Sequence, residues 1–167
     1  MNKITPNNIN ENVFNLIGKD WMLITAKSDK GVNSMTASWG GLGVMWNKNV
    51  CYIVLRPQRY TKEFVDFAES FSLCFFDEDY KKVLSYMGRV SGRYEDKIKN
   101  SGLTLNEIDN IPYFSEAKLV LACKKLFAQE FLSENFIEKG LIEANYPNND
   151  YHTLYIAEIT DCFTKEK

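Results

Sequence analysis

Residues 33–44 read NSMTASWGGLGV, and residues 50–55 read VCYIVL shortly before Pro57. The first stretch combines glycines with Ser, Thr and Trp, and such small residues let a backbone approach a flat ligand edge-on. The same composition also suits a glycine-bent barrel strand that meets no ligand. The second stretch is an apolar, β-branched run of the length of one buried strand. Both stretches therefore predict a protein built on β-strands.

Further strands follow the same pattern along the chain. Apolar runs with β-branched and aromatic residues predict strands at residues 21–27, 71–76, 118–130 and 151–160. The first of these ends at a turn over residues 28–31, which read SDKG. We expect about five or six strands in all, on the pattern rules for strands and turns.

Short helices are expected at three places. Thr61 is a candidate N-cap for one helix, and Asp79 for a second helix that continues to Met87. A third, charged helix is expected over residues 94–100, ending near Gly102. These helices do not alternate regularly with the strands, which argues against a doubly wound sheet. A mainly β fold built as a closed or partly closed antiparallel barrel fits better, because closure removes exposed strand edges.

Length, composition and charge exclude several classes of protein. The chain has 167 residues, of which 45% are apolar and 25% charged, and its net charge is −2. Without a linker or repeat, this predicts a single domain over residues 1–167. The mild acidic balance argues against a nucleic-acid partner, and no run approaches the ~18 apolar residues of a membrane span. The polar N-terminus lacks the apolar core of a secretory signal, so we expect a cytoplasmic protein.

The cysteines and the histidine offer little side-chain chemistry. The four cysteines, at positions 51, 74, 123 and 162, form no CxxC pair, and three of them lie inside apolar runs. This spacing gives no support for a metal site and predicts small buried hydrophobic residues in a reducing compartment. His152 is the sole histidine, so a mechanism that needs two imidazoles is excluded.

The arginines are the most informative residues. The chain has sixteen lysines throughout but only four arginines, and these form two pairs, Arg56 with Arg59 and Arg89 with Arg93. The first pair lies in RPQRYT, residues 56–61, directly after a predicted strand and before a predicted helix. Arginine, two hydroxyls and the free N–H groups of a helix start together make a phosphate site. Surface salt bridges are the alternative for these arginines.

The second pair lies in MGRVSGR, residues 87–93. Its glycines and serine predict a loop that comes close to a ligand. This segment is not a phosphate-binding P-loop, because GxxxxGK[ST] is absent. GGLG at residues 40–43 lacks the GxGxxG spacing of a dinucleotide fingerprint.

NSMTASW, then a buried strand, then RPQRYTKE, then MGRVSGR, in this order, resemble the flavin reductase-like family of FMN-binding split-barrel proteins, which includes flavoredoxin. The resemblance implies a split antiparallel Greek-key β-barrel with a few short peripheral helices. It also implies FMN bound without a covalent bond, and a homodimer, for which Trp46 and Phe136 are candidate exposed contacts. Members of the family either reduce flavin with a nicotinamide donor or pass electrons to a protein partner.

Carried over residue by residue, the resemblance places the isoalloxazine against the strand segment before the double glycine. The residues of that segment are Ser34, Met35, Thr36, Ala37, Ser38 and Trp39. The resemblance implies that Arg56, Tyr60 and Thr61 bind the FMN phosphate. It implies that Arg93, together with Arg89, contacts either the phosphate or a bound second substrate. His152 is either a structural, hydrogen-bonded residue or a substrate contact. The chain departs from common members at Ala157, where a glycine is often found.

The resulting expectation is an oxidoreductase in which bound FMN is the redox centre and NAD(P)H the donor, without a catalytic acid or nucleophile of the protein's own. Two alternatives stay open. One is a flavoredoxin-like FMN electron carrier without its own nicotinamide site. The other is a non-enzymatic barrel that binds a nucleotide, haem or an oligonucleotide.

Overall fold

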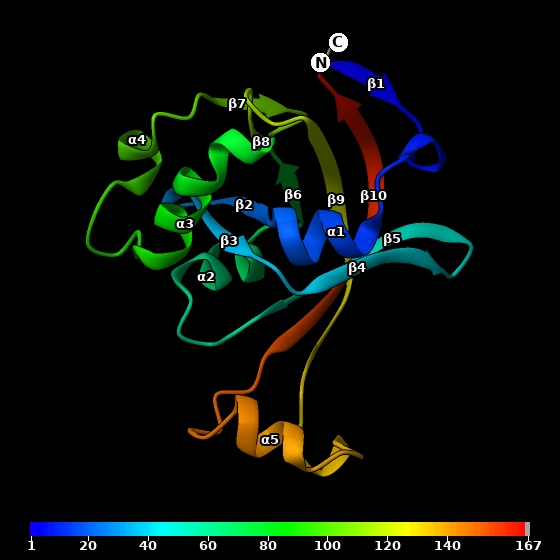
Figure 1. The fold of residues 1–167 in the computed structure, drawn as a ribbon, viewed down its shortest axis with the longest axis vertical. Helices are drawn as coiled ribbons and strands as arrows, with labels where there is room; N and C mark the ends of the chain where they lie inside the picture. Colours follow the sequence, from blue (N-terminus) through cyan, green and yellow to red (C-terminus); the bar gives the residue numbers. More distant parts are fainter. Residues whose placement is uncertain (166–167) are drawn as a thin grey trace.

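One antiparallel sheet forms the body of the protein in the computed structural model, which describes residues 1–165 (Figure 1). Its strands follow the order β3-β2-β6-β9-β10-β5-β4, and β1 pairs with the C-terminal end of β10, on the same edge as β5. The two last residues of the expected 1–167 domain lie outside the described part. The strands are β1 (Asn2–Ile4), β2 (Met22–Ser28), β3 (Gly31–Ala37), β4 (Gly40–Met45), β5 (Lys48–Leu55), β6 (Ser70–Phe75), β7 (Leu105–Ile108), β8 (Ile111–Phe114), β9 (Leu119–Glu130) and β10 (Thr153–Thr164).

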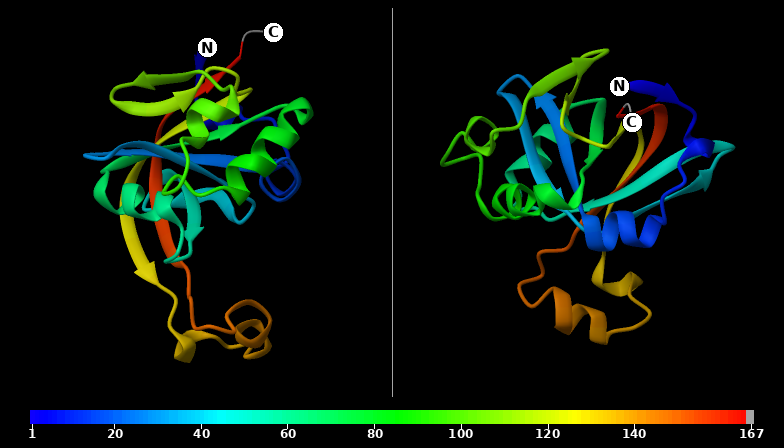
Figure 2. Two further views of the ribbon diagram at one scale, coloured as in Figure 1. Left: turned by 90° about the vertical axis from the view of Figure 1, so that its left-hand side faces the viewer. Right: turned by 45° about the horizontal axis from the view of Figure 1, so that its top comes forward.

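The helices are short and lie around this sheet (Figures 1 and 2). Most of them are single turns between strands, so the expected mainly β fold with a few short peripheral helices is confirmed. The helical elements are η1 (Pro6–Asn8), α1 (Val13–Asn15), η2 (Leu16–Asp20), α2 (Tyr60–Phe67), η3 (Glu78–Tyr80), α3 (Lys81–Arg89), α4 (Lys97–Ser101), η4 (Ser133–Asn135) and α5 (Gly140–Asn145).

The sheet curls into a barrel that stays split between β3 and β4. These strands are the two ends of the sheet's path, and only Ser38 and Trp39 connect them along the chain. Within residues 1–165 no ladder pairs β3 with β4, so the barrel is partly closed. Gly40, directly after the split, has a φ of +151°, and a Cβ there would lie 2.3 Å from the Tyr52 carbonyl oxygen. Glycine is therefore required where the chain turns from β3 into β4.

The structure has more strands than the five or six expected. β4 was open to interpretation because three of its six residues are glycines. β7 and β8 form a separate hairpin whose turn residues Asp109 and Asn110 have positive φ angles of 50° and 63°. Such short hairpins lack the long apolar run that marks a buried strand. The expected strand at residues 151–160 begins two residues later, so Tyr151 and His152 precede β10.

Two clusters of buried side chains hold the sheet and helices together. The first fills the barrel, and Phe64 and Val65 of α2 belong to it. The second lies on the outside of β2 and contains Leu84 of α3 and Phe114 of β8. β2 is buried on both faces because its alternate side chains enter the two clusters. Each large side chain so buried contributes about 1.5–3 kcal/mol relative to exposure.

The helix starts differ from the sequence expectations. α2 begins at Tyr60, and Thr61 lies inside its first turn instead of capping it. Asp79 lies inside η3, and α3 starts after it at Lys81. The charged helix is shorter than expected, because Asp96 caps it by accepting a hydrogen bond from the Lys99 N–H. Its predicted end at Gly102 is confirmed by a left-handed φ of 74°.

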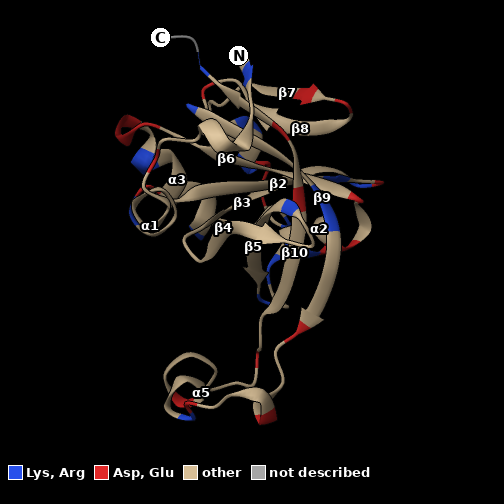
Figure 3. Cartoon of the chain, turned by 90° about the vertical axis from the view of Figure 1, so that its right-hand side faces the viewer, with Lys and Arg blue, Asp and Glu red and all other residues tan. Residues whose placement is uncertain are grey.

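Residues 131–152 form an arm that leaves the body between β9 and β10. The arm contains η4 and α5 and stands away from the barrel in every view (Figures 1 and 2). Lys, Arg, Asp and Glu are interspersed along the rest of the ribbon rather than gathered by sign (Figure 3). No helix within residues 1–165 has the length and apolarity to cross a membrane. The base of the arm returns to the barrel at His152, beside the end of β5.

Candidate functional site

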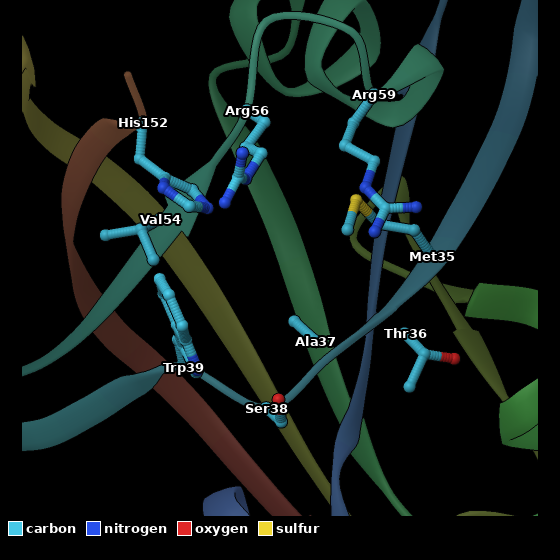
Figure 4. Close-up of a pocket in the computed structure, with 9 residues that line it drawn as sticks. All are labelled: Met35, Thr36, Ala37, Ser38, Trp39, Val54, Arg56, Arg59 and His152. Atoms are coloured by element: carbon cyan, nitrogen blue, oxygen red, sulfur yellow. The ribbon is translucent and has the colours of Figure 1, made fainter. Parts of the chain in front are cut away.

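Two adjoining cavities open where β3, β5 and α2 meet. We call the first, of about 300 Å³, the strand cavity (Figure 4), and the second, of about 430 Å³, the cation cavity. They share Met35, Arg56 and Arg59, so they are neighbours, and we refer to the two together as the hollow. The strand cavity is lined by Met35, Thr36, Ala37, Ser38, Trp39, Val54, Arg56, Arg59 and His152. The cation cavity is lined by Met35, Arg56, Gln58, Arg59, Tyr60, Thr61, Arg89, Val90, Ser91 and Lys97.

The end of β3 and the split form the floor of the strand cavity. Five of the six predicted ring contacts, residues 35–39, line it, whereas Ser34 does not. The Ser34 hydroxyl is buried on the other face of β3, 2.9 Å from that of Thr25. The Thr36 hydroxyl donates to the Leu84 carbonyl at 2.5 Å and points away from the cavity centre in Figure 4. These two side chains therefore hold β3 in place, which leaves mainly the β3 backbone to meet a ligand.

The cation cavity lies at the N-terminal end of α2. The first N–H groups of a helix have no partner inside the helix and attract anions. Thr61, 1% exposed, accepts a hydrogen bond from the Asn33 amide at 3.0 Å. A Cβ at Gly92 would lie 2.4 Å from the Asn33 Oδ1 atom. Gly92 thus packs tightly against the amide that orients the Thr61 hydroxyl.

The four arginines are brought together but have different partners. Arg56 forms an ion pair with Asp150 at 2.5 Å and donates to the Asn145 carbonyl at 2.8 Å. Arg93 pairs with Glu63 and lines neither cavity. Arg59 lines both cavities and donates to the Gly88 carbonyl at 3.0 Å. Arg89 lines the cation cavity, and no ion pair found within residues 1–165 involves Arg59 or Arg89. Their guanidinium groups are therefore the ones free to meet an anion.

Lys97 is a site residue that the sequence analysis missed. Its side chain is 4% exposed, and its ammonium donates to the carbonyls of Met87 at 2.9 Å and Val90 at 3.0 Å. Burial, and then the charge of Arg59, lower the pKa of Lys97 to about 8. An anion in the cation cavity would favour the charged ammonium. In the sequence, Lys97 is one of sixteen lysines and lies in a charged segment, so nothing there indicates that its side chain is buried.

The segment at residues 87–93 is only partly the loop that was expected. Met87, Gly88 and Arg89 form the last turn of α3, and the loop begins at Val90. A Cβ at Gly88 would lie 3.1 Å from the Cβ of Thr36. The two glycines of this segment thus allow α3 and the loop to pack against β3, next to the cation cavity.

His152 lies at the other end of the hollow, at the base of the arm. Its side chain is 7% exposed, and its Nδ1 atom lies 2.8 Å from the Tyr146 hydroxyl. Its ring centroid is 5.2 Å from that of Trp39 (Figure 4). Burial, followed by the charge of Arg56, lowers the pKa of His152 to about 4. The imidazole is therefore neutral at physiological pH, and it is both hydrogen-bonded and part of the cavity wall.

The cysteines lie away from both cavities. All four are free and fully buried, and burial raises the pKa of Cys74 and of Cys162 to about 11. No group of three His, Cys, Asp or Glu side chains suited to a metal ion occurs within residues 1–165. The chemistry available to the site is therefore that of cations, N–H donors, hydroxyls and aromatic rings.

This geometry fits a molecule with a flat polar ring at one end and a phosphate at the other, as FMN has. A comparison with protein families gives a match between residues 15–167 and the flavin reductase like domain. The chain belongs to this family. No curated protein is found with significant similarity to this flavin reductase-like protein.

Solved structures share the fold of this flavin reductase-like protein. An FMN-binding domain of a flavin reductases-like enzyme from Shewanella baltica is 19% identical with a TM-score of 0.71, covering 98% of this chain and 76% of that one. Flavoredoxin from Methanosarcina acetivorans is 22% identical with a TM-score of 0.70, covering 99% and 77%. The styrene monooxygenase flavin reductase from Pseudomonas putida is 16% identical with a TM-score of 0.64, covering 88% and 80%.

Proposed function

We propose that this protein binds FMN without a covalent bond and is an oxidoreductase that takes electrons from a nicotinamide donor. One observation carries the proposal: a cavity floored by strand backbone lies next to a cavity rich in cations at a helix N-terminus. FMN has one end suited to each. The four free cysteines suit a reducing compartment such as the cytoplasm.

The residues divide into two groups along the hollow. The ring would lie against residues 35–39, where backbone groups and the Ser38 hydroxyl can meet its polar edge. The phosphate would be held by Arg59, Lys97, the Thr61 hydroxyl and the first N–H groups of α2. Arg89 stands at the rim of the cation cavity. Arg56, which Asp150 already engages, would add charge at the junction of the two ends.

Bound FMN supplies the hydride and electron chemistry that no side chain of the protein can perform. The protein orients and encloses the cofactor. Trp39 and Val54 line the strand cavity and would shield part of a bound ring from water. The charges of Arg56 and Arg59 would favour extra negative charge on the ring, which reduction brings. Side chains that hold Arg56 in place therefore affect electron transfer as well as binding.

The experiment is anaerobic reduction of the FMN-loaded protein by NADH and, separately, by NADPH. We expect one donor to bleach the flavin absorbance at ~450 nm faster than it bleaches free FMN, because the protein holds ring and donor together. Bleaching by a chemical reductant but by neither nicotinamide would favour an electron carrier, the reading that the likeness to flavoredoxin supports. Failure to bind FMN would contradict both the oxidoreductase and the electron carrier. A barrel that binds a nucleotide other than a flavin would then be the remaining hypothesis.

We also propose a homodimer. Trp46 is 56% exposed and packs on Phe127 with ring centroids 6.5 Å apart, and Ile137 on the arm is 99% exposed. Phe136, the other expected contact, is half-buried against Tyr146 instead. Exposed aromatic and aliphatic side chains of this size suit a second copy. Light scattering should return about twice the chain mass of 19.3 kDa; one chain mass at micromolar concentration would contradict the dimer.

A further inference from the structure

The arm reaches back to the strand cavity through its last eight residues. Arg56 donates to the Asn145 carbonyl and to Asp150, and its guanidinium carbon lies 5.2 Å from the centre of the Tyr146 ring. Arg56 lines the cavity, so three residues of the arm contact one residue of the site. The arm is therefore attached to the site as well as to the ends of β9 and β10.

Packing within the arm fixes the orientation of Tyr146. Its ring lies 5.7 Å from that of Phe136 and 5.0 Å from that of Tyr151, and its side chain is 4% exposed. The His152 ring packs edge-on against it at 5.5 Å. With the ring held on these sides, the hydroxyl is aimed at Nδ1 of His152, 2.8 Å away.

The hydrogen bond decides which nitrogen of His152 carries the proton. The imidazole is neutral, so one ring nitrogen donates and the other accepts. Among the side-chain hydrogen bonds found in residues 1–165, the Tyr146 hydroxyl takes part only in the one to Nδ1. If Nδ1 donated, the buried hydroxyl proton would have no acceptor, which is costly. The favoured arrangement has the hydroxyl donating to Nδ1 and the proton of His152 on Nε2.

With its proton on Nε2, His152 adds a hydrogen-bond donor to a cavity that other hydrogen-bond donors already line. Nδ1 is engaged by the arm, so Nε2 is the nitrogen left for the cavity that the ring lines (Figure 4). The other polar side chains around it include two arginines, the Trp39 indole N–H and the Ser38 hydroxyl, with no carboxylate or amide among the nine lining residues. Such a lining recognises carbonyl or anionic oxygen atoms.

We propose that Tyr146 is a positioning residue that holds His152 as the Nε2–H tautomer, so that the imidazole donates a hydrogen bond to an oxygen acceptor in the strand cavity. The placement of that acceptor on a bound redox ligand rests on the proposed function. The tautomer does not, because it follows from the arm and the barrel alone. The arm is thus part of the site.

The single histidine makes the test direct, because its ¹⁵N NMR signals need no assignment to a residue, and the couplings of each nitrogen to the ring protons distinguish Nδ1 from Nε2. In the unliganded protein at pH 7 we expect Nε2 to carry the proton and Nδ1 to show the shift of an unprotonated nitrogen. In Tyr146→Phe we expect both nitrogens to shift toward values of a mixture of tautomers. Tyr151→Phe is the control, since its hydroxyl donates to Asn149 and its ring packs on Tyr146 without touching the imidazole bond. A proton on Nδ1 in the native protein, or unchanged shifts in Tyr146→Phe, would overturn the proposal.

A second measurement tests the oxygen acceptor. Loss of one positioned donor should weaken the affected ligand about fivefold, the equivalent of one net hydrogen bond. If FMN dissociation rises in Tyr146→Phe, the oxygen belongs to the flavin; if the nicotinamide KM rises with kcat and FMN affinity unchanged, it belongs to the donor. If the FMN dissociation constant and the nicotinamide KM are each the same in Tyr146→Phe as in Tyr151→Phe, the role of His152 as a hydrogen-bond donor is overturned. If the native protein binds no flavin at all, the proposed function fails while the NMR result still decides the tautomer.

Discussion

Arg59→Ala is expected to weaken FMN binding by roughly 10- to 150-fold, the effect of losing a charge-assisted contact worth about 1.5–3 kcal/mol. Arg59 lines both cavities, and the hydrogen bond that its guanidinium makes in the described part of the chain goes to the carbonyl of Gly88. Its exposed side chain gives the fold little support, so the variant should stay folded. Arg56→Ala is a poorer test, because it would leave the Asp150 carboxylate without its ion-pair partner.

Calorimetric titration of the apoprotein measures this effect, with Arg93→Ala as the matched control. Arg93 pairs with Glu63 and lies outside both cavities, so its removal should change FMN affinity much less. Riboflavin, which lacks the phosphate, provides a second comparison. Its affinity should fall less than that of FMN in Arg59→Ala. Equal FMN affinity in the native protein and Arg59→Ala would remove Arg59 from the phosphate site.

The second large effect is a loss of stability on acidification that depends on His152. The pKa of this imidazole is about 4 in the folded protein, because burial and the charge of Arg56 disfavour protonation, against an ordinary value of 6.5. Between these two pH values the unfolded chain binds a proton that the folded chain does not. The free energy of unfolding therefore falls as the pH drops through this window, by up to roughly 3 kcal/mol in total. Below pH 4 the folded protein is protonated too, and this contribution to the slope ends.

Urea unfolding of the native protein and of His152→Asn, at a series of pH values from 7 to 4, isolates the contribution. Asparagine has no titration in this range and can still meet the Tyr146 hydroxyl with its short polar side chain. Carboxylates affect both proteins alike, so the difference between the two curves reports the histidine. We expect the stability gap to change by about 1.4 kcal/mol per pH unit at its steepest. Two parallel curves would show that His152 is not held neutral.

Much of the fold followed from local patterns. The strand over residues 50–55 was evident because it is a continuous apolar run that fills the barrel. The turn at residues 28–31 was evident from its polar residues and glycine, and β2 pairs with β3 across it. β4 was ambiguous because glycine marks a bend and a ligand contact equally well. Its role became clear only from the close approach of Gly40 to Tyr52 on the next strand, β5.

The sequence predicted which types of residue form the site, but not which residues their side chains pair with. Clustering of the arginines indicated an anion site, yet only the fold shows that Asp150 engages Arg56 and Glu63 engages Arg93. Lys97 carries no signal in the sequence, because its burial depends on the packing of α4 against α3. The part played by the arm is likewise a product of tertiary structure, since the arm meets the site where Asn145 and Asp150 accept hydrogen bonds from Arg56, which is distant in sequence.

The measurement that tests the central claim most directly is a crystal structure of the protein with FMN. The account predicts the ring against residues 35–39 and the phosphate at the start of α2, within hydrogen-bond distance of Arg59 and Thr61, with Lys97 beside it. Electron density for the flavin elsewhere on the molecule, or two empty cavities in crystals grown with saturating FMN, would contradict it.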